Sequence, residues 1–204
     1  PMDLTNTLVG AHILSALFTA GIYFFSQPEV VGGTPPLVRA LSFTSQNINH
    51  FYVWTLITYP FIHMPTIWLI IGLFFFWWFG REVECSLGMR TFLILYSQVI
   101  VIPPLVLYLC SFKIGPVAFS DTQHIHFMVF VAWVFIHPGA LLFFQIPAKW
   151  FAAVFITVYT IHDFSLRDWD QVIFLWASLL TTFFVLRHYG VNGCFRLTGW
   201  FSTR

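Results

Sequence analysis

Apolar residues gather in six long runs that more polar segments separate. The runs are Thr7–Phe25, Pro65–Gly80, Thr91–Cys110, Phe127–Phe144, Trp150–His162 and Trp169–Tyr189. An α-helix rises about 1.5 Å per residue, so about 20 apolar residues cross the hydrocarbon core of a bilayer. Four runs have that length, the second reaches it if it begins near Ile62, and the fifth is short. The pattern predicts an all-α, polytopic bundle of six transmembrane helices, with five as the alternative.

Composition agrees with a membrane protein. Of the 204 residues, 58% are hydrophobic and only 8% are charged, whereas a soluble domain averages about 25% charged residues. This leaves no room for a separate soluble module, and the net charge of +1 gives no reason to expect a nucleic-acid partner. Three cysteines without paired spacing do not indicate disulfides.

The longest connection, 26–64, separates the first two runs. Its glycines and prolines indicate turns at the start, and the remainder mixes apolar and aromatic residues. A connection of this length is usually structured or functional. We expect short helices lying in the outer membrane interface, with Phe51, Tyr52, Trp54 and Tyr59 as an aromatic belt. A mobile loop is the alternative.

Prolines and basic residues predict further features of the bundle. Pro103-Pro104 should bend the third helix, and Pro138-Gly139 should bend or end the fourth. With six spans, more Lys and Arg residues fall on the side of the termini than on the other side. The excess predicts that both termini lie inside, with 1–189 as the membrane domain and 190–204 as an inner-face tail.

A compact charged turn joins the second and third runs. It contains Gly80, Arg81, Glu84, Gly88 and Arg90. Both glycines permit sharp chain reversals, and Glu84 can accept backbone N–H groups at the start of the third helix, where an anion is favoured. The arginines can pair with the acidic residues. We expect the turn to stabilise the fold. The alternative is a generic charged loop on the inner side with no structural role.

The loop and the turn together carry a recognisable order of parts. The loop contains Trp54-Thr55 and then Phe61-Ile62-His63, and the turn reads Gly80-Arg81-x-x-Glu84-x-x-x-Gly88, followed by Arg90 and Tyr96. This order resembles the rhomboid superfamily, which includes intramembrane serine proteases, inactive rhomboid-like proteins and derlins. The resemblance implies a six-helix membrane fold with Trp54, Phe61 and His63 in an interfacial loop. Thr55 replaces the Arg that the family typically has there.

The proteolytic half of that resemblance is missing. The resemblance to rhomboid proteases would imply a catalytic Ser/His pair, with the serine in Gly-x-Ser-Gly at the start of the fourth helix and the histidine on the sixth. Residues 120–126 read SDTQHIH, and Phe174 and Trp176 stand where small residues would let these helices touch. The sixth run has only His188, about 28 Å along the helix from the level of Ser120. We therefore predict an inactive rhomboid-like protein rather than an enzyme.

Histidines and carboxylates near the outer helix ends could instead bind a metal. Asp121, His124, His126 and His162 are candidate ligands for zinc or iron. A His-x-His pair places its rings about 200° apart on a helix, so one face cannot present both. The alternative is that these residues hydrate the interface and cap helices, with Asp121 and Asp168 as N-cap candidates.

Haem or pigment binding is a further alternative. His12, His137 and His162 lie in or near apolar runs and could be axial ligands. No two of them have a spacing that defines a site, so we predict no cofactor.

Three functions remain open from the sequence. The favoured one is a non-catalytic protein that binds or scaffolds other transmembrane proteins, since 26 Phe and nine Trp provide much apolar surface. The second is a small accessory or structural subunit of a larger, multi-subunit membrane complex of the bioenergetic kind. The third is an intramembrane enzyme with an unrecognised site.

Overall fold

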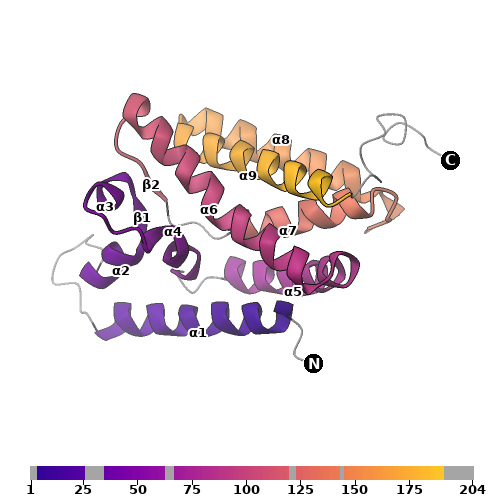
Figure 1. Cartoon of the computed structure of the whole chain (residues 1–204), viewed down its shortest axis with the longest axis horizontal. Coiled ribbons are helices and arrows are strands. Elements are labelled where there is room, and N and C mark those ends of the chain that lie inside the picture. The colour runs from indigo at the N-terminus through magenta and orange to yellow at the C-terminus, as the bar shows by residue number, and fades with distance from the viewer. Residues whose placement is uncertain (1–3, 26–34, 63–66, 120–122, 143–144, 191–204) are drawn as a thin grey trace.

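The computed structural model describes residues 4–25, 35–62, 67–119, 123–142 and 145–190. Six long helices follow the six apolar runs in order. They are α1 (Leu4–Phe25), α5 (Ile67–Leu87), α6 (Met89–Ile114), α7 (Gln123–Ile136), α8 (Ala148–Leu166) and α9 (Trp169–His188). Figure 1 shows α1 along one edge of the bundle, α8 and α9 along the opposite edge, and α6 crossing between them. The predicted helical class is therefore confirmed.

The core lies where α5, α6, α7 and α9 meet. The most extensive packing joins α6 to α9 and α5 to α7, while α1 packs mainly against α5. The largest fully buried apolar side chains include Phe76 on α5, Phe92 on α6, Ile125 on α7 and Phe174 on α9. The outer helices α1 and α8 instead expose many apolar side chains, as expected for helices that contact lipid.

Among the described residues, three helices are long and apolar enough to cross a membrane. These stretches are Leu4–Tyr23, Met89–Ile114 and Trp169–His188. The chain is thus an integral membrane protein, and the predicted six spans are supported to that extent only. The expected lengths also need correction, because α8 has 19 residues while α7 has only 14.

Prolines act differently in α6 and α7. Helix α7 ends at Ile136, just before Pro138, because a residue preceding proline disfavours helical backbone. Helix α6 continues through Pro103 and Pro104. Pro104 has no N–H for the carbonyl of Ile100, four residues earlier, and the Tyr59 hydroxyl donates to that carbonyl at 3.0 Å instead.

The connection before α5 is structured over 35–62. It contains α2 (Pro36–Leu41), β1 (Phe43–Thr44), α3 (Ser45–Asn49), α4 (Thr55–Thr58) and the 3-10 helix η1 (Tyr59–Phe61). The predicted short helices are therefore confirmed for this part of the loop. Figure 1 shows them grouped at one end of the bundle, between α1 and α6.

A short sheet attaches this loop to the connection between α6 and α7. Strand β1 pairs antiparallel with β2 (Ala118–Phe119). Ser45 extends the pairing, because its N–H donates to the Val117 carbonyl at 2.9 Å and its hydroxyl accepts from the Val117 N–H at 3.1 Å. The sequence did not predict these strands, since each has only two residues.

The predicted aromatic belt needs one correction. Phe51 is 84% exposed, and Tyr52 and Trp54 are also exposed. Tyr59 is fully buried, and its hydroxyl donates to the Ile100 carbonyl of α6. Trp54 also holds the loop together, since its indole N–H donates to the Ala40 carbonyl at 3.2 Å.

Candidate functional site

The carboxylate of Glu84 closes the start of α1. Its Oε1 accepts the backbone N–H of Leu4 at 2.8 Å, and its Oε2 accepts the Thr5 N–H at 2.8 Å and the Thr5 hydroxyl at 2.6 Å. The first N–H groups of a helix lack partners within the helix, and an anion is favoured beside them. The expectation that Glu84 serves the third helix is therefore wrong, because its carboxylate binds the first.

Protonation of Glu84 follows from these contacts. Burial alone would raise the pKa of this carboxyl, but the bonds from Thr5 and Leu4 lower it below the ordinary value of 4.5. Hydrogen bonds to the charged form outweigh the cost of removing it from water. Glu84 is therefore a carboxylate at neutral pH, as its role at the start of α1 requires.

The two glycines of the turn have different surroundings. Gly80 lies inside α5, not in a reversal, and a Cβ there would come within 3.1 Å of the Thr5 methyl carbon. Gly88 is the single residue between α5 and α6 and has a φ of +81°, a conformation that favours glycine. Gly80 thus lets α1 approach α5, whereas Gly88 turns the chain.

Other polar residues at this end of α5 contact its neighbours. The indole N–H of Trp133 on α7 donates to Oε2 of Glu82, and that of Trp77 donates to Oδ1 of Asn6 on α1 at 2.9 Å. Arg81 and Arg90 are exposed. The charged end of α5 therefore links α1 and α7 through its acidic and aromatic side chains.

A buried polar cluster lies deeper in the bundle. His12 on α1 is fully buried, and its Nε2 shares a hydrogen bond of 2.7 Å with the Tyr96 hydroxyl on α6. The His126 ring on α7 lies 5.1 Å from the His12 ring, centroid to centroid, and Phe61 stacks on His12 at 4.9 Å. Phe61 thus joins the predicted loop to this cluster, and His63 lies outside the described residues.

The candidate metal ligands do not converge in the part of the chain that the structure describes. His124 faces Tyr159 on α8 and Phe174 on α9, with ring centroids at 5.6 and 5.9 Å. His126 faces the opposite side, toward α1 and α5. No group of three or more His, Cys, Asp or Glu residues gathers among the described residues, and Asp121 is not one of them.

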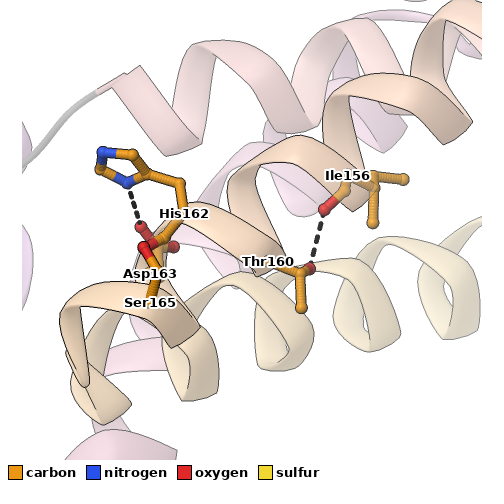
Figure 2. Close-up of polar contacts among 5 residues, drawn as sticks. All are labelled: Ile156, Thr160, His162, Asp163 and Ser165. Carbon is orange, nitrogen blue, oxygen red and sulfur yellow. Dashed lines mark hydrogen bonds and ion pairs between the residues drawn. The ribbon is translucent and has the colours of Figure 1, made fainter.

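His162 lies apart from the other histidines, near the end of α8. Its side chain is 64% exposed, and its Nδ1 lies 3.1 Å from Oδ1 of the buried Asp163. Figure 2 shows this pair. The Ser165 hydroxyl donates to the carbonyl of His162 at 2.7 Å. Asp168 is the N-cap residue of α9, the position predicted for it, although its side chain makes no cap hydrogen bond.

An apolar groove of about 330 Å³ opens between α5, α7 and α8. Its described lining is almost entirely aromatic or aliphatic, and His126 and Gly72 lie among these residues. The lining includes Ile71, Gly72, Phe75, Phe79, His126, Phe127, Phe130, Leu142, Phe151, Phe155 and Tyr159. A Cβ at Gly72 would come within 3.1 Å of His126 Nδ1. Gly72 thus leaves room for the His126 ring beside the groove.

Sequence reasoning did not find this groove. The second run is apolar on every face of its helix. The spacing of its aromatic residues does not distinguish positions that face lipid from positions that line a groove. The one available signal was Gly72, since a glycine in a helix interior usually marks a close approach.

The fold and these sites define a helical integral membrane protein whose long helices enclose buried histidines and an apolar groove. Residues 50–192 match the family model of the Rhomboid domain. The match covers most of the chain, from the loop through α9, so the chain belongs to the rhomboid family. No curated protein and no solved structure matches the chain significantly.

Proposed function

We propose that this protein is a non-catalytic rhomboid-family member that binds a transmembrane helix of another protein in the groove between α5 and α8. The observation that carries the proposal is the groove itself, which is lined by apolar side chains from three helices. We take all six long helices to cross the membrane, with both termini inside. A groove in that setting faces lipid and is open to helices that diffuse in the bilayer.

The chemistry of the lining favours a helix as the occupant. The apolar lining can pack against the apolar face of a membrane helix. Gly72 leaves room for the His126 ring, because a Cβ at that position would lie 3.1 Å from His126 Nδ1. His126 supplies a polar ring at the same level.

The contact between the starts of α7 and α9 supports the absence of catalysis. In rhomboid proteases this is where a serine and a histidine meet. Here the rings of His124 and Phe174 fill the contact, with their centroids 5.9 Å apart. On α9, the Ser178 hydroxyl donates its hydrogen bond to the carbonyl of Phe174 at 2.7 Å. It is therefore not hydrogen-bonded to a base through that proton. Nucleophilic catalysis requires a hydroxyl hydrogen-bonded to a base.

Site-specific photo-crosslinking tests the groove. A benzophenone amino acid replaces Phe155, which lines the groove, or Phe18, an exposed residue of α1. We expect discrete protein adducts from position 155 and mainly lipid adducts from position 18. Equal adduct patterns from both positions would overturn the proposal.

Matched glycine variants test whether the adducts depend on the groove. Gly72→Leu should fill the space beside His126 and abolish the adducts from position 155. Gly10→Leu is the control, because a Cβ at Gly10 meets nothing within 4 Å. Adducts that persist in a folded Gly72→Leu protein would contradict binding in the groove.

Two further measurements separate the alternatives. Purification in mild detergent with a partner at fixed stoichiometry would identify an accessory subunit, whereas exchanging partners would identify a scaffold. A fluorophosphonate probe tests for an activated serine. Covalent labelling that disappears in Ser120→Ala would refute the non-catalytic assignment.

A further inference from the structure

A second pocket, of about 560 Å³, lies at the charged end of α5. Its described lining combines two tryptophans with one residue of each charge and the histidine that follows α7. The residues that matter here are Trp77, Trp78, Arg81, Glu82 and His137. Tryptophan and arginine gather where a helix passes from hydrocarbon to the lipid headgroups. The pocket therefore lies at headgroup depth, away from the groove.

Its formal charges balance. Arg81 contributes a positive charge and Glu82 a negative charge, and both line the same space. Glu82 is held in place by the indole N–H of Trp133, so its carboxylate is a fixed feature of the wall. An anionic ligand would leave one negative charge uncompensated, whereas a ligand with both charges would match the wall.

His137 provides a second indication of a ligand. Its Nδ1 is buried and has no hydrogen-bond partner among the described residues, although its backbone N–H donates to the Trp133 carbonyl at 2.8 Å. A buried polar atom without a partner is costly, so such atoms are usually satisfied by water, an ion or a ligand. The imidazole can donate from Nδ1 to a phosphate oxygen.

We propose that this pocket binds the headgroup of a zwitterionic phospholipid, phosphatidylethanolamine or its choline counterpart. Arg81 and His137 bind the phosphate, since guanidinium groups match phosphate oxygens. Glu82 and an indole face of Trp77 or Trp78 bind the ammonium group, because a cation is attracted to both. Trp78 is 52% exposed. The pocket is therefore open on this side, and the acyl chains of the bound lipid can extend from it into the bilayer.

Thermal unfolding in a lipid-free detergent tests the proposal. Binding to the folded state alone raises the apparent Tm. We expect phosphatidylethanolamine to raise it more than phosphatidylglycerol, which carries a net negative charge. Equal stabilisation by the two lipids would overturn the zwitterionic assignment.

The same titration distinguishes the lipid from a soluble phosphate compound. Glycerophosphoethanolamine and inorganic phosphate carry the phosphate without acyl chains, and we expect both to bind much more weakly than the lipid. Stabilisation by either of them that equals that of phosphatidylethanolamine would overturn the lipid assignment in favour of a soluble ligand.

Arginine variants place the effect in the pocket. Arg81→Gln should weaken phosphatidylethanolamine binding by at least about tenfold, as expected for loss of a charged hydrogen bond. Arg90→Gln, exposed at the start of α6, should bind like the unmodified protein. Trp78→Leu gives a second test. It should weaken the binding of phosphatidylethanolamine and leave the binding of phosphatidylglycerol unchanged. An equal loss in Arg81→Gln and Arg90→Gln would refute the site.

Discussion

Glu84 accepts both the backbone N–H and the hydroxyl of Thr5, a residue 79 positions earlier in the chain. One carboxylate near the end of α5 thereby satisfies the start of α1. The third bond, from Leu4, completes the contact. Four predictions follow from this and related contacts.

Glu84→Ala should strongly destabilise the protein. It removes three hydrogen bonds to a charged group and leaves the buried N–H of Thr5 and the part-buried N–H of Leu4 without this partner, so we expect a loss of about 2–4 kcal/mol. Thermal unfolding in detergent measures the effect. Cys85→Ala is the control, since Cys85 is the next residue along α5 and is exposed. Similar losses in both variants would show that the contact contributes little.

Stability should decrease as the solution becomes acidic. The folded-state pKa of Glu84 lies below its ordinary value of 4.5, so the unfolded chain binds a proton more readily. The contribution is fully present above about pH 4.5 and is lost as the pH falls through the folded-state pKa. Glu84→Gln lacks this titration. We expect the Tm difference between the unmodified protein and Glu84→Gln to shrink between pH 6 and pH 3, and a constant difference would contradict the role of Glu84.

Tyr59→Phe should leave the Ile100 carbonyl without its donor. A buried carbonyl without a hydrogen bond costs about 1–3 kcal/mol. In a Pro104→Ala background the alanine N–H can take over this bond, so Tyr59→Phe should cost much less there. A double-mutant cycle of unfolding free energies measures the coupling. Additive effects would show that the hydroxyl does not compensate for the proline.

Gly80→Val should separate α1 from α5. Its side chain would overlap the methyl group of Thr5, and overpacking typically costs about 1–3 kcal/mol. Thr5→Ser removes that methyl group but keeps the hydroxyl that binds Glu84, so the double variant should regain part of the loss. Gly10→Val is the control, because a Cβ there meets nothing within 4 Å. The absence of any rescue would locate the clash elsewhere.

The helices were predictable because their signals are local. Six apolar runs gave the number and order of the long helices, and Pro138 marked the end of α7. Their lengths were less predictable. Helix α5 continues through Arg81 and Glu82 to Leu87, because charged residues at the membrane boundary remain compatible with helix. The sequence pattern could not distinguish that from a polar turn.

The site depended on contacts that no local pattern contains. The partners of Glu84, Leu4 and Thr5, lie just before the first apolar run and far from Glu84 in the sequence. Tyr59 has the aromatic character of an interfacial residue, although its hydroxyl donates to α6. His124 and His126 were predicted to point apart, and their ring contacts follow that geometry. Helical periodicity thus predicted orientations, whereas the identity of the neighbours required the folded chain.

The donors to Glu84 have a consequence for dissecting the protein. The family match begins at residue 50, yet α1, which precedes it, contributes every hydrogen bond described for the Glu84 carboxylate. In a fragment that starts at residue 50, the Glu84 carboxylate would lack these donors, and Gly80 on α5 would lack its contact with Thr5. Such a fragment also lacks β1, which pairs with β2, so it should fold poorly alone and recover only in part when α1 is supplied as a separate peptide.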